Sequence, residues 1–174
     1  MTETNDCEEC GFRDDAVTMA DAVEALPAFG ARYRERLSGV EPGLLRSRPA
    51  PGTWSPLGYA AHVRDVFAWY EEWVGRALVE DRPVVAAPTP DEAAELGRYD
   101  ELDAGEVATA LAANAERLAA RFAAVPEEAW PRVHVRRGHE RSVLFTARRA
   151  VHEGDHHLLD IDRGLRSLGH GAGS

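Results

Sequence analysis

Two histidines late in the sequence, His152 and His156, are spaced one helical turn apart. Side chains four residues apart share one face of a helix, so this pair can point two imidazoles at one ion. A third histidine, His62, falls on the inward stripe of an earlier predicted helix. Three histidine ligands leave a fourth position open for water or substrate. The sequence therefore predicts a divalent-metal site at His62, His152 and His156, against the simpler alternative of separate core or surface histidines.

Two further polar residues flank this pair. His157 lies about 100° around a helix from His156, so we assign it to the surroundings of the site or to the surface. Asp160 lies one turn beyond His156 and could orient its imidazole, although a solvated carboxylate explains that position equally well.

Residues 152–156 also match the H-E-x-x-H pattern of zinc proteases, in which the glutamate is the general base. The rest of the protease pattern is missing. No glutamate follows Glu153 as a downstream ligand, and Leu159 stands where the longer pattern has glycine. Gly154 would also loosen the helix. Peptidase activity is therefore disfavoured.

A Cys-x-x-Cys pair, Cys7 and Cys10, lies near the start of the sequence. It is compatible with half of a zinc knuckle, with a redox pair, or with two incidental thiols, and the last interpretation is slightly favoured. Two ligands do not make a structural zinc site. Its completion would require a second subunit, so that a homodimer stays open, or one of His134, His139 and His170.

Four segments could position these residues, because their apolar residues recur every three or four positions, as in amphipathic helices. Two of them have clear start signals, Ser55 followed by Pro56 and Asp103 with Glu106. Pro27 predicts a kink or a late start in the first segment. The four predicted helices span residues 18–37, 55–80, 103–125 and 143–168.

The segments between these helices read as connections. Residues 42–52 and 81–100 are rich in proline or glycine, and residues 126–141 are interpreted as a loop that could hold a short extended piece. The predicted fold is all-α, a four-helix bundle with long connections between helices 1 and 2 and between helices 2 and 3. The predicted organisation is a flexible acidic leader, one bundle domain and a flexible tail, at residues 1–17, 18–168 and 169–174.

The composition excludes several classes of function. The 174 residues carry a formal net charge of −10, which repels phosphate backbones and disfavours nucleic-acid binding. No run of about 18 apolar residues is present, and the first residues are polar and acidic. We therefore expect no membrane span and no signal peptide, and a cytoplasmic protein. Two cysteines are too few for a disulfide scaffold.

The sequence Pro-Gly-Thr-Trp-Ser at residues 51–55, the helix carrying His62, and the His-x-x-x-His pair of the last helix together resemble the DinB-like superfamily. The resemblance spans about residues 18–168, and the Cys-x-x-Cys-Gly leader is similar to that of actinobacterial members. It implies a four-helix bundle with a divalent metal, zinc first and nickel second. The implied ligands are His62 from the second helix and His152 and His156 from the last.

The resemblance also implies a chemistry, because such proteins include thiol S-transferases and isomerases that use mycothiol, bacillithiol or glutathione. The expected function is a metal-dependent thiol S-transferase, in which a mycothiol-like thiol becomes a thiolate at the metal and attacks a small electrophilic substrate. Two alternatives stay open. One is a hydrolase that uses metal-activated water, and the other is a non-catalytic stress protein that binds metal or a small ligand.

Overall fold

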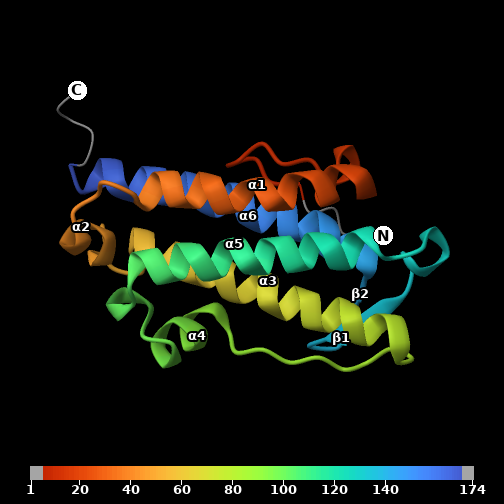
Figure 1. Ribbon diagram of the computed structural model, residues 1–174. Coiled ribbons are helices and arrows are strands. Elements are labelled where there is room, and N and C mark those ends of the chain that lie inside the picture. Colours follow the sequence, from red (N-terminus) through yellow and green to blue (C-terminus); the bar gives the residue numbers. More distant parts are fainter. Residues whose placement is uncertain (1–5, 170–174) are drawn as a thin grey trace.

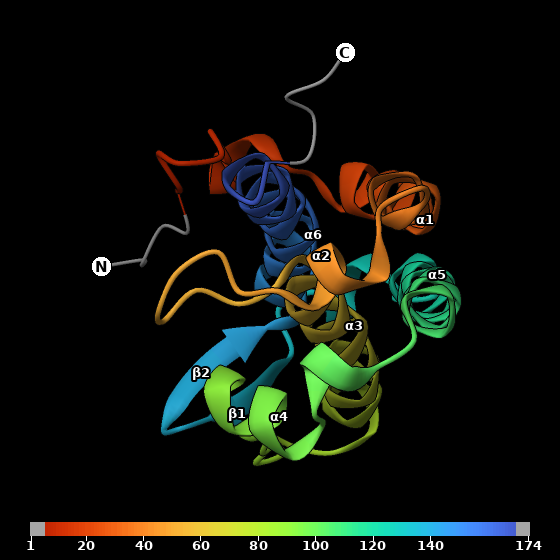
Figure 2. The same cartoon turned by 90° about the vertical axis from the view of Figure 1, so that its left-hand side faces the viewer.

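The computed structural model describes residues 6–169, and its four long helices form a bundle (Figure 1). The helices α1 and α3 occupy opposite corners, and each packs against both of the others, α5 and α6 (Figure 2). The predicted four-helix bundle is confirmed. The four helices are α1 (Met19–Leu37), α3 (Pro56–Val79), α5 (Ala104–Ala123) and α6 (Val143–Ser167).

Capping side chains explain where these helices begin. The Ser55 hydroxyl accepts a hydrogen bond from the Gly58 backbone N–H at 2.9 Å, and the Asp103 carboxylate accepts one from the Glu106 N–H at 2.9 Å. These acceptors satisfy N–H groups that have no partner within a helix. The helix α1 begins at Met19 and continues through Pro27, so the late start expected from this proline does not occur.

The long connections are confirmed, although they hold more structure than the sequence indicated. Residues 42–52, expected as a loop, begin with the one-and-a-half-turn helix α2 (Pro42–Arg46), which the Glu41 side chain caps. The second connection contains α4 (Pro90–Leu96) and the 3-10 turn η2 (Tyr99–Glu101). Two more 3-10 turns, η1 (Asp14–Ala16) and η3 (Glu127–Ala129), precede α1 and follow α5.

The segment interpreted as a loop after α5 contains a β-hairpin, formed by β1 (Val133–Arg136) and β2 (His139–Ser142). Arg137 and Gly138 both have positive φ, 51° and 79°, as a two-residue type I′ turn requires. The Val135 N–H donates to the Pro83 carbonyl at 2.8 Å, and its carbonyl accepts from the Val85 N–H at 2.9 Å. The hairpin is thereby joined to the chain between α3 and α4.

Residues 6–17, expected as part of a flexible leader, lie along α6 (Figure 2). Arg148 of α6 donates to the Val17 carbonyl at 2.9 Å and to the Asp14 carboxylate at 3.1 Å. Phe12 is buried, and its ring lies 5.1 Å from the ring of His152. Residues 1–5 of the leader and 170–174 of the tail lie outside the described residues.

A glycine allows α1 and α6 to approach closely beside the candidate site. A Cβ atom on Gly154 would lie 2.4 Å from the Phe29 ring of α1, so the aromatic side chain fills the space that a larger residue would occupy. The Tyr33 hydroxyl donates to the Gly154 carbonyl at 2.9 Å. Gly154 therefore joins two helices closely instead of loosening one. Among the described residues, no helix has the length and apolar character needed to cross a membrane.

Candidate metal centre

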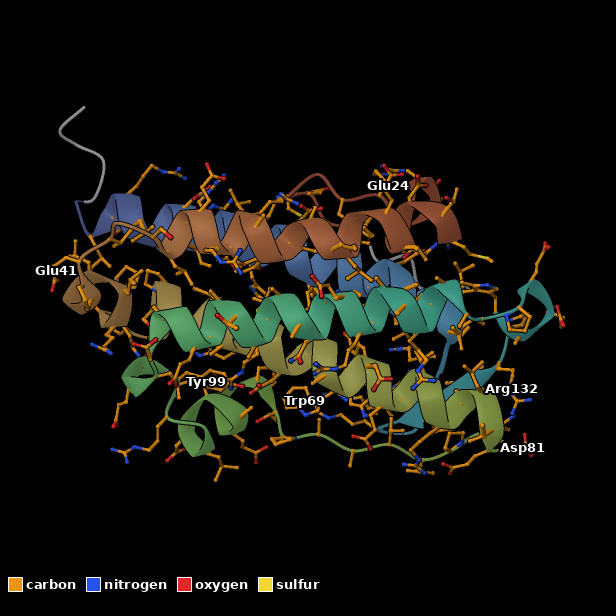
Figure 3. All side chains as sticks on the ribbon, viewed as in Figure 1. Glu24, Glu41, Trp69, Asp81, Tyr99 and Arg132 are labelled. Atoms are coloured by element: carbon orange, nitrogen blue, oxygen red, sulfur yellow. The ribbon has the colours of Figure 1, made fainter. Side chains whose placement is uncertain are left out.

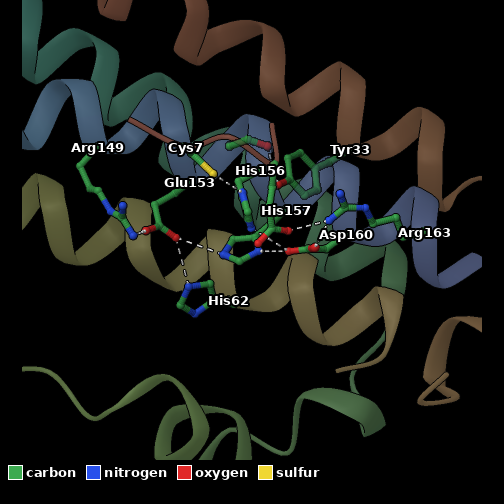
Figure 4. Close-up of polar contacts among 11 residues, drawn as sticks. Cys7, Tyr33, His62, Arg149, Glu153, His156, His157, Asp160 and Arg163 are labelled. Carbon is green, nitrogen blue, oxygen red and sulfur yellow. Dashed lines mark hydrogen bonds and ion pairs between the residues drawn. The ribbon is translucent and has the colours of Figure 1, made fainter. Parts of the chain in front are cut away.

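The helix α6 carries two overlapping pairs of metal-binding side chains. His152 and His156 form one pair and Glu153 and His157 the other, each with a spacing of four residues. The pairs are offset by one residue, which turns one face about 100° from the other. The first pair faces the N-terminal segment, and the second faces α3 (Figure 4).

The second pair meets His62 of α3. The Glu153 Oε2 atom lies 3.1 Å from His157 Nε2 and 3.4 Å from His62 Nε2, and the two imidazole rings are 5.0 Å apart in a T-shaped arrangement. One ligand atom from each residue lies within 4.8 Å of the others. We call His62, Glu153 and His157 the α3–α6 cluster.

Positive charge surrounds the Glu153 carboxylate, which is 6% exposed. Arg149 forms an ion pair with it at 2.6 Å. Burial by itself would raise the pKa of Glu153, but the hydrogen bonds from His157 and His62 and the nearby guanidinium outweigh it and hold the pKa well below its usual range. The Glu153 carboxylate is therefore ionised.

A second carboxylate orients His157. Asp160 Oδ2 lies 2.9 Å from His157 Nδ1, while Glu153 faces the other ring nitrogen. Burial lowers the pKa of His157, but the two carboxylates outweigh it and raise the pKa to about 9. The ring also stacks on Tyr59 at 5.3 Å. Both ring nitrogens therefore face a carboxylate, and the ring must lose the proton directed at Glu153 before that nitrogen can bind an ion.

His62 and Glu153 line a cavity of about 170 Å³, which lies between α3 and the connection to α4. Figure 3 shows Trp69, another lining residue, on this side of α3. A neighbouring cavity of about 290 Å³ shares part of the same wall. Three arginines, Arg136, Arg137 and Arg149, line both cavities, and Arg141 also lines the larger one.

The α3–α6 cluster fits a divalent metal by its donors. Two imidazoles and one carboxylate form a three-ligand set that leaves at least one position open, as in catalytic zinc sites. His62 Nδ1 is buried with no hydrogen-bond partner among the described residues, so this ring has unused capacity for coordination. Two of the three residues, His62 and Glu153, line the cavity with the arginines.

The other pair on α6 meets the cysteines. One ligand atom from each of Cys7, Cys10, His152 and His156 lies within 4.8 Å of the others. We call these four residues the cysteine–histidine cluster. His152 is buried, and desolvation together with the charge of Arg149 lowers its pKa to about 4, so its ring is neutral.

The structure thus divides the three predicted histidine ligands between two groups. His152 and His156 lie together, as expected, whereas His62 lies with Glu153 and His157. A single centre made of all three histidines stays a prediction, and among the described residues it is not one of the groups whose ligand atoms lie within 4.8 Å of one another.

Sequence reasoning did not select two members of the α3–α6 cluster, Glu153 and His157, as ligands. His157 was assigned to the surroundings or the surface, yet it contacts both His62 and Glu153. Asp160 lies closer to His157, at 2.9 Å, than to His156, at 3.5 Å, the residue it was expected to orient. The sequence feature that could have identified them is the Glu-x-x-x-His motif of Glu153 and His157, which begins one residue after the His-x-x-x-His motif.

The three histidines proposed to complete the cysteine pair lie elsewhere or outside the structure. His134 is buried against Thr146, and His139 is exposed on the hairpin. His170 is outside the described residues. The partners are instead His152 and His156, because residues 6–17 fold back onto α6.

Comparison with known proteins agrees with this architecture. The profile of the DinB superfamily matches residues 25–161. The fold is similar to that of YfiT from Bacillus subtilis, described as a probable metal-dependent hydrolase with an unusual four-helix bundle topology, with a TM-score of 0.81, 15% identity and 87% of each chain covered. It is also similar to a mycothiol-dependent maleylpyruvate isomerase, with a TM-score of 0.67, 17% identity, and 85% of this chain and 62% of that chain covered. Among curated proteins, none matches the sequence.

Proposed function

The chain belongs to the DinB superfamily, and from this membership we propose that it is a divalent-metal-dependent enzyme acting on a small molecule, with His62, Glu153 and His157 as its metal ligands. The observation that carries the proposal is the convergence of both imidazoles on one buried carboxylate beside a cavity. Zinc is the proposed ion, because this donor set is typical of catalytic zinc.

We propose thiol S-transfer as the reaction. A divalent cation at the α3–α6 cluster would favour the thiolate form of a mycothiol-like thiol, which is the nucleophilic form. Glu153 and Asp160 hold His157 from both ring nitrogens, and Arg149 balances the charge of Glu153. The protein thus fixes the ligands before any ion arrives.

The residues of the cavity wall are suited to bind a negatively charged substrate or thiol. Arginines pair with carboxylates through two parallel hydrogen bonds, and Arg136, Arg137 and Arg149 all line the cavity next to the cluster. Trp69 and Trp73 add flat apolar surface. These residues favour a small substrate or thiol that carries negative charge together with an apolar or unsaturated part. The mycothiol-dependent isomerase of similar fold supports the use of a thiol.

A second candidate is hydrolysis of a small molecule by metal-activated water, which needs the same ligands and no thiol. The similarity to YfiT, described as a probable metal-dependent hydrolase, favours this alternative over a non-catalytic role. The two reactions differ in one requirement, the dependence of turnover on a low-molecular-weight thiol.

One experiment tests the metal and the reaction together. Zinc-loaded and chelator-treated protein would be compared in conjugation of mycothiol, bacillithiol or glutathione to a fluorogenic alkylating probe. We expect conjugation only with metal, and its loss in His157→Ala. The exposed hairpin residue His139 provides the control, since His139→Ala should keep full activity.

The other outcomes are equally informative. Metal-dependent hydrolysis of small esters or amides without thiol would replace transfer by hydrolysis. Intact metal with no turnover of any substrate would indicate the binding protein. If His157→Ala keeps both the metal content and the activity of the parent protein, the α3–α6 cluster is not the centre.

A further inference from the structure

We propose that Cys7, Cys10, His152 and His156 bind a second divalent cation, preferably Zn²⁺, which fastens the N-terminal segment to α6. This structural site is separate from the α3–α6 cluster and does not rest on the proposed function. Its ligands come from two parts of the chain that are 149 residues apart at Cys7 and His156.

The arrangement of the donors supports a single ion. One ligand atom from each of the four residues lies within 4.8 Å of the others. Cys7 Sγ approaches His156 Nδ1 to 3.5 Å (Figure 4). The rings of His152 and His156 are 5.1 Å apart. Two thiolates and two imidazoles are the Cys₂His₂ set of structural zinc sites.

Buried nitrogens without partners point to a missing ligand. His152 is 7% exposed, and neither of its ring nitrogens has a hydrogen-bond partner among the described residues. Leaving a buried polar atom unpaired costs free energy. Coordination of either nitrogen would remove one such cost, whereas ordinary core packing would leave both.

The surroundings of His156 match those of a metal ligand. One ring nitrogen, Nδ1, faces the Cys7 sulfur, while the other, Nε2, lies 3.5 Å from Asp160 Oδ2. A carboxylate behind the nitrogen that does not bind the ion is the usual support for a zinc-bound histidine. Asp160 therefore stands between the two clusters, next to one histidine of each.

The cysteines are held in position by contacts that need no metal. The Cys7 N–H donates to the Phe12 carbonyl at 2.9 Å, closing a turn in which Gly11 has a φ of 75°. Arg163 of α6 binds Glu9 at 2.8 Å. The N-terminal segment thus places the two sulfur atoms next to α6, and both cysteines are free thiols.

The two clusters should differ in role because they differ in ligand number. Four protein ligands complete a tetrahedral shell and leave no position for substrate, which is the mark of a structural site. The α3–α6 cluster supplies three ligands and borders a cavity. The cysteine–histidine cluster therefore stabilises the fold, and the other centre remains open for chemistry.

The test counts metal ions site by site. Full-length protein purified with zinc in reducing buffer should hold two equivalents by elemental analysis. Cys7→Ser with Cys10→Ser should lose one and keep the other. His157→Ala should also lose one, but from the α3–α6 cluster, so failure of the proposed function would leave the cysteine result unchanged.

A spectrum identifies the ligands without relying on a variant that could unfold. Parent protein loaded with Co²⁺ should show an intense thiolate-to-cobalt charge-transfer band. The band should persist in His157→Ala and vanish in the double cysteine variant. Absence of this band in the parent protein, or two zinc equivalents in a folded double cysteine variant, would overturn the proposal. A Cys7–Cys10 disulfide in protein kept under reducing conditions would overturn it as well.

Discussion

At the scale of single residues, Glu153 shows how the protein keeps a charge in its interior. A buried carboxylate costs free energy unless charged or hydrogen-bonding partners surround it. Arg149 approaches one of its oxygen atoms, and His157 and His62 approach the other. The negative charge is thus retained beside His62 and His157, where it would attract a cation. The arginine comes from the same helix, one turn before the glutamate.

A second buried histidine, His134, should make stability depend on pH. Its Nε2 lies 3.0 Å from the Thr146 hydroxyl, which itself donates to the Ser142 carbonyl, so the histidine must be the donor. Its Nδ1 is buried without a partner among the described residues. Burial, aided by Arg136 and Arg141, lowers the pKa of His134 from 6.5 to about 4.

The folded pKa is depressed, so the unfolded chain binds the proton first as pH falls. The contribution of His134 is complete above pH 6.5 and is lost as pH falls from 6.5 to about 4. At about 1.4 kcal/mol per pKa unit, the difference between 6.5 and about 4 amounts to at most about 3.5 kcal/mol. Urea unfolding at several pH values should show that acidification lowers the free energy of unfolding less in His134→Gln than in the parent protein. Parallel curves for variant and parent would contradict this.

Residue types revealed the chemistry of the site more readily than the grouping of its members. His152, His156 and His62 could be selected as candidate ligands from the sequence, since helical spacing and an inward stripe are local signals. His157 could not be placed, because its direction is fixed by the rotation of α6 against α3. That rotation depends on contacts between helices and not on spacing along one of them.

At the scale of elements, two helical glycines should respond in opposite ways to alanine. A Cβ at Gly154 would meet the Phe29 ring at 2.4 Å, whereas one at Gly75 of α3 would meet only the end of the Arg121 side chain, at 3.6 Å. We expect Gly154→Ala to destabilise the fold by about 1–3 kcal/mol through overpacking. Gly75→Ala should stabilise it by about 0.5–1 kcal/mol, because alanine favours the helix.

Thermal or urea unfolding of both variants checks this pair. A stabilised Gly154→Ala protein would show that α1 and α6 can move apart at no cost in free energy. The close packing of Gly154 against Phe29 would then not be needed for stability. The matched substitution at Gly75 controls for the change in helix propensity, which is the same in both cases.

The long helices were predictable because their apolar residues recur at helical spacing and two of them, α3 and α5, carry clear start signals. Ser55, Asp103 and the apolar stripes specify the helix locally. The hairpin after α5 was not identified, since its turn is Arg137-Gly138 in place of the Asn-Gly that marks type I′ turns. Its outer partner, the chain at Pro83 and Val85, is also distant in sequence.

At the scale of the whole molecule, the charge of the cavity opposes the charge of the chain. The net charge is −10, yet three arginines line the cavity beside the α3–α6 cluster. Arg137→Gln should raise the dissociation constant of a small dicarboxylate such as maleate roughly two- to fivefold, the effect of one exposed ion pair. Calorimetry on metal-loaded protein would measure it.

An exposed arginine of α1 gives the matched control. Arg34→Gln changes the net charge by the same amount, but Arg34 does not line the cavity. Its dissociation constant should therefore equal that of the parent protein. Equal weakening in both variants would mean that overall charge, and not the cavity wall, attracts the anion.

The folding of the first residues onto the last helix has a consequence for how the protein is made. Cys7 precedes His156 by 149 residues, so at about 5–20 residues per second a ribosome delivers the imidazole roughly 7–30 s after the thiol. Until the end of that interval the cysteines lack the two histidines of their cluster, His152 and His156. Once α6 emerges, an ion that bridges the two would close a loop of about 150 residues, a constraint on the unfolded chain of about 5 kcal/mol by loop-closure entropy. Synthesis therefore leaves residues 6–17 without these partners until α6 has been made, and α6 is the helix that would secure them.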